Sequence, residues 1–228
     1  MTKDLDEWRF HGGRVYDYES LKLPHVVSLI ESLDYPNRHP VVIDVGGGEC
    51  SVVHSARLPF RRHFLTATLD IAIPDQTTAA NPRIKEDIEQ LTRGEAPVAY
   101  QSLVGFLESS TPSGREVGAD LIVYSEILNY VDFRQIMTWF DEHLLPGGYT
   151  VIANLPTRGW SKLFSEMGVK SHEELLAFAV NELGHEIVAQ EYPRGATDDY
   201  EGFLVMATRK PEVPQQQKPQ ESGLLVTI

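Results

Sequence analysis

The sequence has little of several features that mark particular protein classes. Its 228 residues include one cysteine, Cys50, which excludes an internal disulfide and a zinc site built from several cysteines. No hydrophobic run approaches the length that a transmembrane helix requires. The charged residues after Met1 are followed by no apolar stretch, which predicts neither a secretory signal nor a membrane anchor. We therefore expect a soluble, cytoplasmic protein.

Positive charge is also scarce. Asp and Glu total 33 residues against 20 Lys and Arg, and the formal net charge is −13 at pH 7. Such a charge repels the phosphates of nucleic acids and anionic lipids at long range. The run Arg61-Arg62-His63 is too short to form a basic patch that would reverse this repulsion. We expect neither a nucleic-acid nor a membrane partner, and a small-molecule substrate fits the charge better.

The composition predicts one main domain between two smaller segments. Hydrophobic residues make up 42% of the chain and charged residues 23%, which is ordinary for a globular protein with a full core. Residues 1–38 contain an aromatic, charged segment and then a helix-like pattern from Leu21 to Leu33, which predicts a covering helix that ends before Pro36. Residues 39–209 form the main domain. The tail, residues 210–228, is rich in Pro and Gln. Its apolar end, residues 223–228, could add to a sheet edge of a second copy, so a homo-oligomer formed through the tail is possible.

The most informative stretch runs from residue 41 to residue 48. Val41–Val45 is an almost continuous apolar run, which is typical of a strand buried on both faces of a parallel sheet. Three glycines follow at once, and glycines let the backbone turn sharply and bring its N–H groups close to a ligand. A second apolar segment ends at Asp70, about where nucleotide-binding α/β units place an acid against ribose hydroxyls. The pattern predicts a nucleotide-type site in which Asp44 steadies the glycine turn and Asp70 binds the sugar.

Strand-like and helix-like segments alternate through the main domain. The predicted strands cover residues 41–45, 63–69, 83–88, 120–124, 149–154, 186–192 and 203–208. The predicted helices of this domain cover residues 96–109, 133–145 and 160–183. The loop between the last two strands is too short for a crossover helix, so these strands should be antiparallel neighbours. We predict a doubly wound α/β fold with a mostly parallel seven-stranded sheet and a C-terminal antiparallel hairpin.

Four segments together resemble the class I S-adenosylmethionine-dependent methyltransferases, a family with a Rossmann-like seven-stranded sheet and a reversed last strand. The segments are residues 41–48, 69–70, 119–131 and 144–149, and the similarity covers about residues 40–209. The resemblance implies that the cofactor is S-adenosyl-L-methionine. It also implies in-line methyl transfer to an N, O, S or C nucleophile of a small metabolite or biosynthetic intermediate.

The resemblance further implies where the cofactor binds. Glycines 46 and 48 would approach its methionine part, Asp70 would meet the ribose, and the pair at residues 87 and 88 would meet the edge of the adenine. Positions just past the fourth strand line the methyl-transfer site in this family. The implied cofactor-binding residues are Asp44, Gly46, Gly47, Gly48, Asp70, Ile71, Asp87, Ile88 and Ser125.

The acceptor side of the predicted site has no obvious base. Asn129 and Tyr130 stand near the position where many small-molecule O-methyltransferases have a histidine, and neither is a good base near neutral pH. Because transfer to an already nucleophilic atom depends mainly on alignment, we expect Glu126 and Tyr130 to orient the acceptor, with His11 as a third catalytic candidate. The histidines show no metal-ligand spacing, and we expect no metal. The substrate-binding candidates are Tyr16, Tyr18, Asn129 and Trp160.

Two alternatives remain open from the sequence. The glycine run also occurs in spermidine-synthase-like aminopropyltransferases. These enzymes need an acidic amine-binding site after the fourth strand, where this sequence supplies a single acid, Glu126. A non-catalytic partner subunit with the same fold is the other alternative. It is motivated by Cys50, which stands where the family has its third glycine, and by the missing histidine base. Fold alone does not separate these functions.

Overall fold

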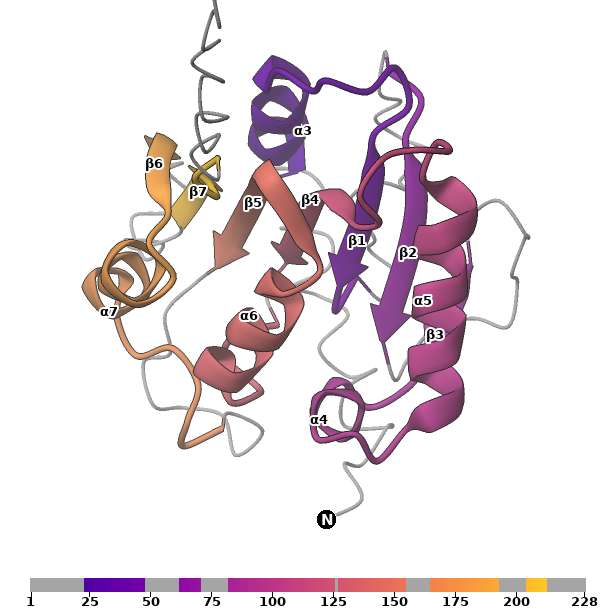
Figure 1. Cartoon of the computed structure of the whole chain (residues 1–228). Coiled ribbons are helices and arrows are strands. Elements are labelled where there is room, and N and C mark those ends of the chain that lie inside the picture. The colour runs from indigo at the N-terminus through magenta and orange to yellow at the C-terminus, as the bar shows by residue number, and fades with distance from the viewer. Residues whose placement is uncertain are drawn as a thin grey trace, which may run out of the picture.

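The computed structural model contains one seven-stranded sheet with helices on both faces (Figure 1). It describes residues 23–47, 62–70, 82–125, 127–154, 165–192 and 204–212. The strands are β1 (Val41–Val45), β2 (Leu65–Asp70), β3 (Arg83–Lys85), β4 (Ala119–Ser125), β5 (Leu144–Asn154), β6 (Glu186–Glu191) and β7 (Leu204–Arg209). The helices are α3 (Leu23–Ser32), α4 (Ile88–Thr92), α5 (Pro97–Ser110), α6 (Phe133–Asp141), α7 (His172–Ala177) and the π-helical turn η3 (Phe178–Glu182).

The strand order confirms the predicted fold class. It is β3-β2-β1-β4-β5-β7-β6. Strands β1 to β5 pair in parallel, whereas β7 runs antiparallel to both β5 and β6. The order reverses on either side of β1, which makes the junction of β1 and β4 a topological switch point. Ligands of open α/β sheets bind outside the carboxyl ends of the strands at such a point.

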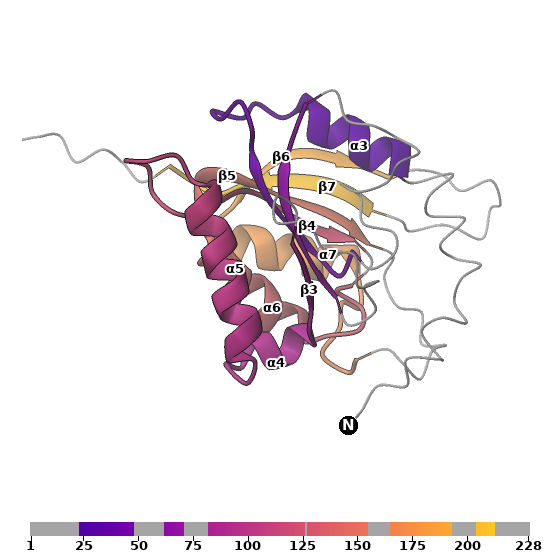
Figure 2. The same ribbon diagram turned by 90° about the vertical axis from the view of Figure 1, so that its right-hand side faces the viewer.

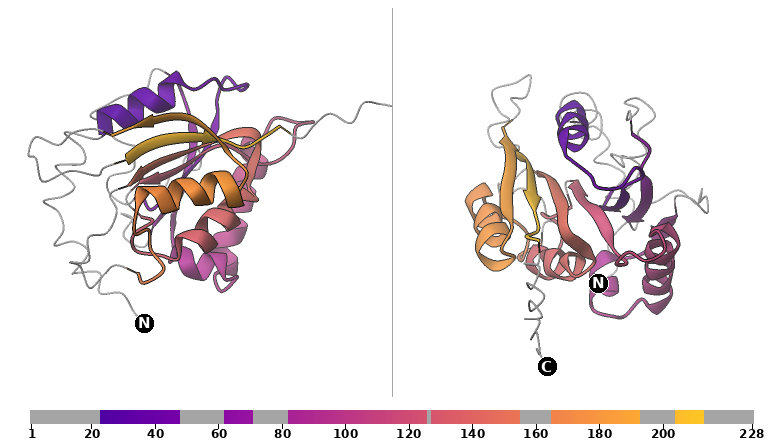
Figure 3. Two further views of the ribbon diagram at one scale, coloured as in Figure 1. Left: turned by 90° about the vertical axis from the view of Figure 1, so that its left-hand side faces the viewer. Right: turned by 45° about the horizontal axis from the view of Figure 1, so that its top comes forward.

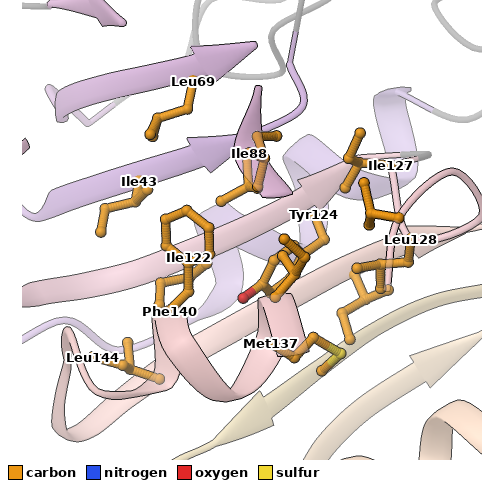
Figure 4. Close-up of a cluster of buried hydrophobic side chains, with 14 of the residues drawn as sticks. Ile43, Leu69, Ile88, Ile122, Tyr124, Ile127, Leu128, Met137, Phe140 and Leu144 are labelled. Carbon is orange, nitrogen blue, oxygen red and sulfur yellow. The ribbon is translucent and has the colours of Figure 1, made fainter. Parts of the chain in front are cut away.

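The sheet is buried on both faces where the sequence is most apolar. Every residue of β1 and of β4 is buried, as their uninterrupted apolar runs predict. Helices α4, α5, α6 and α7 cover one face, and α3 covers the other (Figures 2 and 3). The larger core lies between the sheet and the group of four helices, and its central part includes Ile43, Ile122 and Phe140 (Figure 4). The smaller core joins α3 to β5 and β7 through residues such as Ile30 and Val205.

Several element boundaries differ from the sequence prediction. The third strand ends at Lys85, because Asp87 caps a short helix, α4, that the sequence pattern did not predict. The helix predicted for residues 133–145 ends at Asp141, and β5 begins at Leu144. The predicted turn at residues 146–148 instead forms an irregular first part of β5. Gly147 N–H donates to the carbonyl of Lys210, and Lys210 N–H donates to that of Gly148.

The predicted helix over residues 160–183 is shorter in the described part of the chain. Helix α7 starts at His172, because the Ser171 hydroxyl accepts a hydrogen bond from the backbone N–H of Glu174 and caps the first turn. The chain then passes into η3, which ends before Gly184 (φ +73°). Residues 166 and 167 form a turn and residue 168 a bend, and the rest of residues 165–171 have no regular secondary structure.

Two polar clusters fasten the sheet at the amino ends of its parallel strands. The Asp120 carboxylate accepts hydrogen bonds from the N–H of Val41 (2.8 Å) and from the amide of Asn37 (2.6 and 2.9 Å). In the second cluster, His185 contacts Thr208 Oγ1 through Nδ1 (3.0 Å) and Asp141 through Nε2 (2.9 Å). The Lys210 ammonium lies 3.1 Å from the other Asp141 oxygen. Each cluster joins segments far apart in the sequence.

Candidate functional site

The carboxyl ends of the parallel strands gather the predicted site residues at one edge of the sheet. The arrowheads of β1, β2 and β5 point to the lower edge in Figure 1. Gly46 follows β1, Asp70 ends β2, and Ser125 ends β4. Val45 pairs with Tyr124, and Ser125 pairs with Ala153, so the ends of β1, β4 and β5 lie side by side. The topology therefore places Val45 beside Tyr124, although 79 positions separate them in the sequence.

The glycine turn after β1 has space for backbone only. Gly46 has φ +73°, and its N–H donates to the carbonyl of Leu69 at 2.8 Å. A Cβ at Gly46 would lie 2.5 Å from Cβ of Ile127, and a Cβ at Gly47 would lie 2.9 Å from a carboxylate oxygen of Asp44. Asp44 is fully buried against this turn. The packing explains why these positions need glycine and leaves the turn bare of side chains.

Asp70 ends the strand that fastens the glycine turn. Its backbone pairs with Lys85 of β3, and its carbonyl accepts the N–H of Glu86 at 3.1 Å. The preceding residue, Leu69, holds Gly46. Asp70 is partly exposed, unlike the buried residues 66–69 before it. The structure thus places a partly exposed aspartate next to the residue that holds the glycine turn.

Asp87 and Ile88 occupy the start of α4. The Asp87 carboxylate accepts the N–H of Glu89 at 2.9 Å and so caps this helix. Ile88 is 4% exposed and packs in the larger core (Figure 4). The Glu89 carboxylate in turn accepts the N–H of Asp132 at 3.1 Å, which ties α4 to the start of α6. The local role of Asp87 is therefore a helix cap, and its role toward an adenine ring stays a prediction.

The turn after β4 is held by a second segment from beyond β5. Tyr130 N–H donates to the carbonyl of Ile127 (2.9 Å), which closes the turn. Ser165 N–H donates to the Asn129 carbonyl (3.0 Å), and Val169 N–H donates to that of Leu128 (3.1 Å). A Cβ at Gly168 would lie 2.3 Å from the Asn129 carbonyl oxygen, so only glycine permits this approach. Asn129 is therefore held both by its own turn and by the segment that contains Ser165 and Gly168.

One residue of this edge escaped the sequence prediction. Asn154, the last residue of β5, is fully buried, and its amide donates to Oδ1 of Asn129 at 3.0 Å. The signal was a polar residue that ends an apolar strand at the carboxyl edge, the same signal that marked Asp70. Ser125, Asn129 and Tyr130 are also buried, with 8%, 2% and 9% exposure. The described side chains of this acceptor-side group are thus uncharged.

The tyrosine beneath this group is protonated at neutral pH. Burial raises the pKa of Tyr124 well above its ordinary value, and the charge of Asp141 raises it further. Its ring packs against Phe140 at a centroid distance of 6.3 Å. Tyr124 therefore belongs to the core, as Figure 4 shows, and is unsuited to act as a base.

Several predicted site residues lie outside the described residues. They are His11, Tyr16, Tyr18, Gly48, Cys50, Ile71, Glu126, Trp160 and the tail segment 223–228. Within the described ranges, no cluster of His, Cys, Asp and Glu is suited to a metal ion. No helix in the same ranges is long and apolar enough to cross a membrane. A hollow of about 380 Å³ is lined by residues of α4, α6 and η3, including Thr92, Trp139 and Glu182, and by none of the strand-end residues.

Comparison with known proteins supports the fold and gives no sequence relative. No protein-family model and no curated protein sequence matches the chain. A chain of the complex between the Haloferax volcanii Trm112 methyltransferase activator and a putative methyltransferase superposes with TM-score 0.59 and 16% identity, covering 91% of this chain and 97% of the other.

Two further solved structures are similar. Burkholderia thailandensis 1,6-didemethyltoxoflavin-N1-methyltransferase, with bound 1,6-didemethyltoxoflavin and S-adenosylhomocysteine, has TM-score 0.56 and 14% identity over 89% of this chain and 84% of the other. The N-methyltransferase NodS from Bradyrhizobium japonicum WM9, in complex with S-adenosylhomocysteine, has TM-score 0.53 and 17% identity over 86% of this chain and 91% of the other. Together with the strand order β3-β2-β1-β4-β5-β7-β6, these similarities show that the chain has the Rossmann-like fold of the class I S-adenosylmethionine-dependent methyltransferases.

Proposed function

We propose that the protein is an S-adenosylmethionine-dependent methyltransferase that acts on a small molecule. The observation that carries this proposal is the bare glycine turn at the switch point, with Asp70 at the end of the adjacent strand. Two structural neighbours, the 1,6-didemethyltoxoflavin-N1-methyltransferase and the N-methyltransferase NodS, were solved with S-adenosylhomocysteine bound, and the first also holds its small-molecule substrate, which supports the same cofactor here. The net charge of −13 disfavours a nucleic-acid substrate.

The described residues fit this cofactor by their chemistry. Gly46 and Gly47 carry no side chain that would keep the amino-acid end of a ligand from the backbone of the turn, and Asp70 offers carboxylate oxygens to a pair of ribose hydroxyls. Asp87, Ile88 and Ser125 complete the proposed cofactor set, together with Gly48 and Ile71 from outside the described residues. When bound, S-adenosylmethionine supplies a methyl group activated by a sulfonium charge.

The residues of this chain would contribute alignment and exclusion of water. Asn129 and Tyr130 are buried at the end of β4 and present neutral polar groups that orient an acceptor without removing its proton. Glu126 and His11 are proposed to orient the acceptor as well, and Tyr16, Tyr18 and Trp160 to form its pocket wall. An acceptor atom that is already nucleophilic at neutral pH needs no stronger base.

Calorimetric titration with S-adenosylhomocysteine tests the proposal. We expect wild type to bind, and we expect Asp70→Ala to bind about thirtyfold more weakly because a charge-assisted pair of hydrogen bonds to the ribose is lost, roughly 2 kcal/mol. Glu95→Ala is a matched control, because Glu95 is an exposed acid that pairs with the exposed Arg93. Absence of heat with wild type at millimolar ligand would reject the methyltransferase and favour a non-catalytic subunit. Equal affinity of Asp70→Ala and wild type would reject the ribose assignment.

A further inference from the structure

The amide oxygen of Asn154 lacks a hydrogen-bond donor. Asn154 is 0% exposed, and its Nδ2 donates to Asn129, but its Oδ1 is buried with no partner among the described residues. A buried amide oxygen without a donor destabilises the folded state, and more than nine in ten buried polar groups in native proteins are paired. The exception calls for a donor that arrives with a bound molecule or with water.

The position of this oxygen favours a bound molecule. Asn154 ends β5 at the carboxyl edge, one residue beyond the Ala153–Ser125 pair and two strands from the glycine turn of β1. Neighbouring strands are about 4.8 Å apart, so β1 and β5 are separated by about 10 Å across β4. That span accommodates a cofactor held at β1 and an acceptor held beyond β4. The oxygen therefore lies at the acceptor side of the proposed site.

The partner of Asn154 is held rigidly in place. The carbonyl of Asn129 accepts from Ser165 N–H, and Gly168 approaches the same carbonyl more closely than any side-chain-bearing residue would permit. The Asn129 side chain is 2% exposed and accepts from Asn154. Because two segments hold Asn129, the Asn129–Asn154 pair is preorganised. A small local movement therefore does not easily bring a donor to the Asn154 oxygen.

The described residues next to the pair in sequence and in strand register are uncharged. They are Leu128, Tyr130, Ala153 and, across β7, Leu204. An uncharged, buried site favours a neutral polar group over an ion, because burying an unpaired charge costs far more than burying a hydrogen-bonding dipole. An amide oxygen accepts and does not donate. The complementary ligand group is thus an uncharged N–H or O–H.

We propose that Asn154 Oδ1 accepts a hydrogen bond from an uncharged N–H or O–H group of the methyl acceptor, and that Asn129 holds Asn154 in register for this contact. The inference rests on the proposed methyl transfer and adds to it the polarity of the acceptor. Asn154 is a positioning and specificity residue that the sequence pattern did not single out.

Fragment pairs that differ in one donor test this proposal. Indole and 1-methylindole, and phenol and anisole, are titrated by ligand-observed NMR against the full chain, with and without saturating S-adenosylhomocysteine. We expect wild type to bind the donor-bearing member of at least one pair about fivefold more tightly, the worth of one hydrogen bond to a neutral group. Asn154→Leu should bind both members equally, and Asn154→Ser should regain part of the preference because its hydroxyl both donates to Asn129 and accepts.

Thermal unfolding separates binding from a structural role. Asn154→Leu removes a buried unmet oxygen but also takes away the donor to Asn129 Oδ1, and because these two effects oppose each other we expect a melting temperature close to that of wild type. Asn37→Leu is the matched control: its amide nitrogen donates to both carboxylate oxygens of Asp120, so its melting temperature should fall while the fragment preference stays. The proposal is overturned if wild type shows no donor preference in any pair, if it prefers the methylated members, or if Asn154→Leu keeps the preference. Loss of S-adenosylhomocysteine binding with an intact donor preference would reject the methyltransferase and leave the Asn154 contact standing.

Discussion

The two edges of the sheet use polar residues in opposite ways. At the amino edge, Asp120 accepts three hydrogen bonds, and Asp141 is paired with both His185 and Lys210. At the carboxyl edge, Gly46 has room for no side chain, and Asn154 keeps a buried oxygen without a donor among the described residues. The polar groups of these two clusters at the amino edge pair with one another and so stabilise the fold. At the second edge, we propose that the unpaired oxygen of Asn154 is available to a ligand.

The comparison implies that the glycine turn is the part least tolerant of an added atom. Gly46→Ala adds a Cβ 2.5 Å from Ile127 at a φ of +73°, so we expect a loss of about 3–4 kcal/mol of unfolding free energy from overpacking and backbone strain together. Gly114 is a matched control, because it has φ +83° and nothing within 4 Å of an added Cβ. Gly114→Ala should cost about 1 kcal/mol, from strain alone.

Urea unfolding of the two glycine variants measures this difference. The fraction of Gly46→Ala that remains folded should not bind S-adenosylhomocysteine. Gly114→Ala should bind it like wild type. Equal losses of stability in the two variants would show that the close approach to Ile127 carries no cost.

Breaking the amino-edge cluster should affect stability and leave the ligand site unchanged. Asp141→Asn removes the charge shared by His185 and Lys210, and we expect a loss of about 2 kcal/mol at pH 7. Affinity for S-adenosylhomocysteine should be unaffected, because this cluster lies at the opposite edge. Glu142→Gln, at the adjacent exposed acid, is the control. It should cost less than about 0.5 kcal/mol of unfolding free energy, as most surface substitutions do.

The same variant has a defined pH dependence. Burial alone would raise the pKa of Asp141, but hydrogen bonds from His185 and Lys210 outweigh burial and lower it below the ordinary 3.8. A lowered folded-state pKa stabilises the protein above the unfolded-state value, and this contribution disappears as the pH falls from about 4 through the folded-state pKa. The unfolding free energies of wild type and Asp141→Asn should therefore converge below pH 4. A difference that stays constant down to pH 2 would contradict the charge pairing.

The smallest effect concerns Asp87, which stands at the carboxyl edge and yet serves the fold as a helix cap. Asp87→Ala should cost about 1 kcal/mol, and Asp87→Ser should recover it, because a serine hydroxyl also accepts the N–H of Glu89. If Asp87 also meets the cofactor, Asp87→Ser will be stable but will bind S-adenosylhomocysteine more weakly than wild type. Asp132→Ser, at the cap of α6, is the control for both measurements. Unchanged affinity in Asp87→Ser would leave this residue a structural cap only.

Much of the fold could be predicted from the sequence because it depends on the local pattern of apolar residues and on loop length. The continuous apolar runs of β1 and β4 predicted strands buried on both faces, and the short loop after β6 predicted the antiparallel hairpin. Boundaries failed where tertiary contacts compete with local preference. Residues 146–148 look like a turn, but Gly147 and Gly148 exchange hydrogen bonds with Lys210 and extend β5 toward its amino end.

By itself, the sequence determined the class of fold and the identity of the glycine turn, since both follow from the chemistry of neighbouring residues along one strand and the turn after it. Only the tertiary structure decided that Asn129 and Asn154 form a pair, because they are 25 residues apart and meet through the parallel pairing of β4 with β5. It also decided that Gly168 belongs to the site region, where a glycine is needed for the backbone of Asn129 to pass. Contacts between strand ends depend on sheet order, and sheet order is a property of the folded chain.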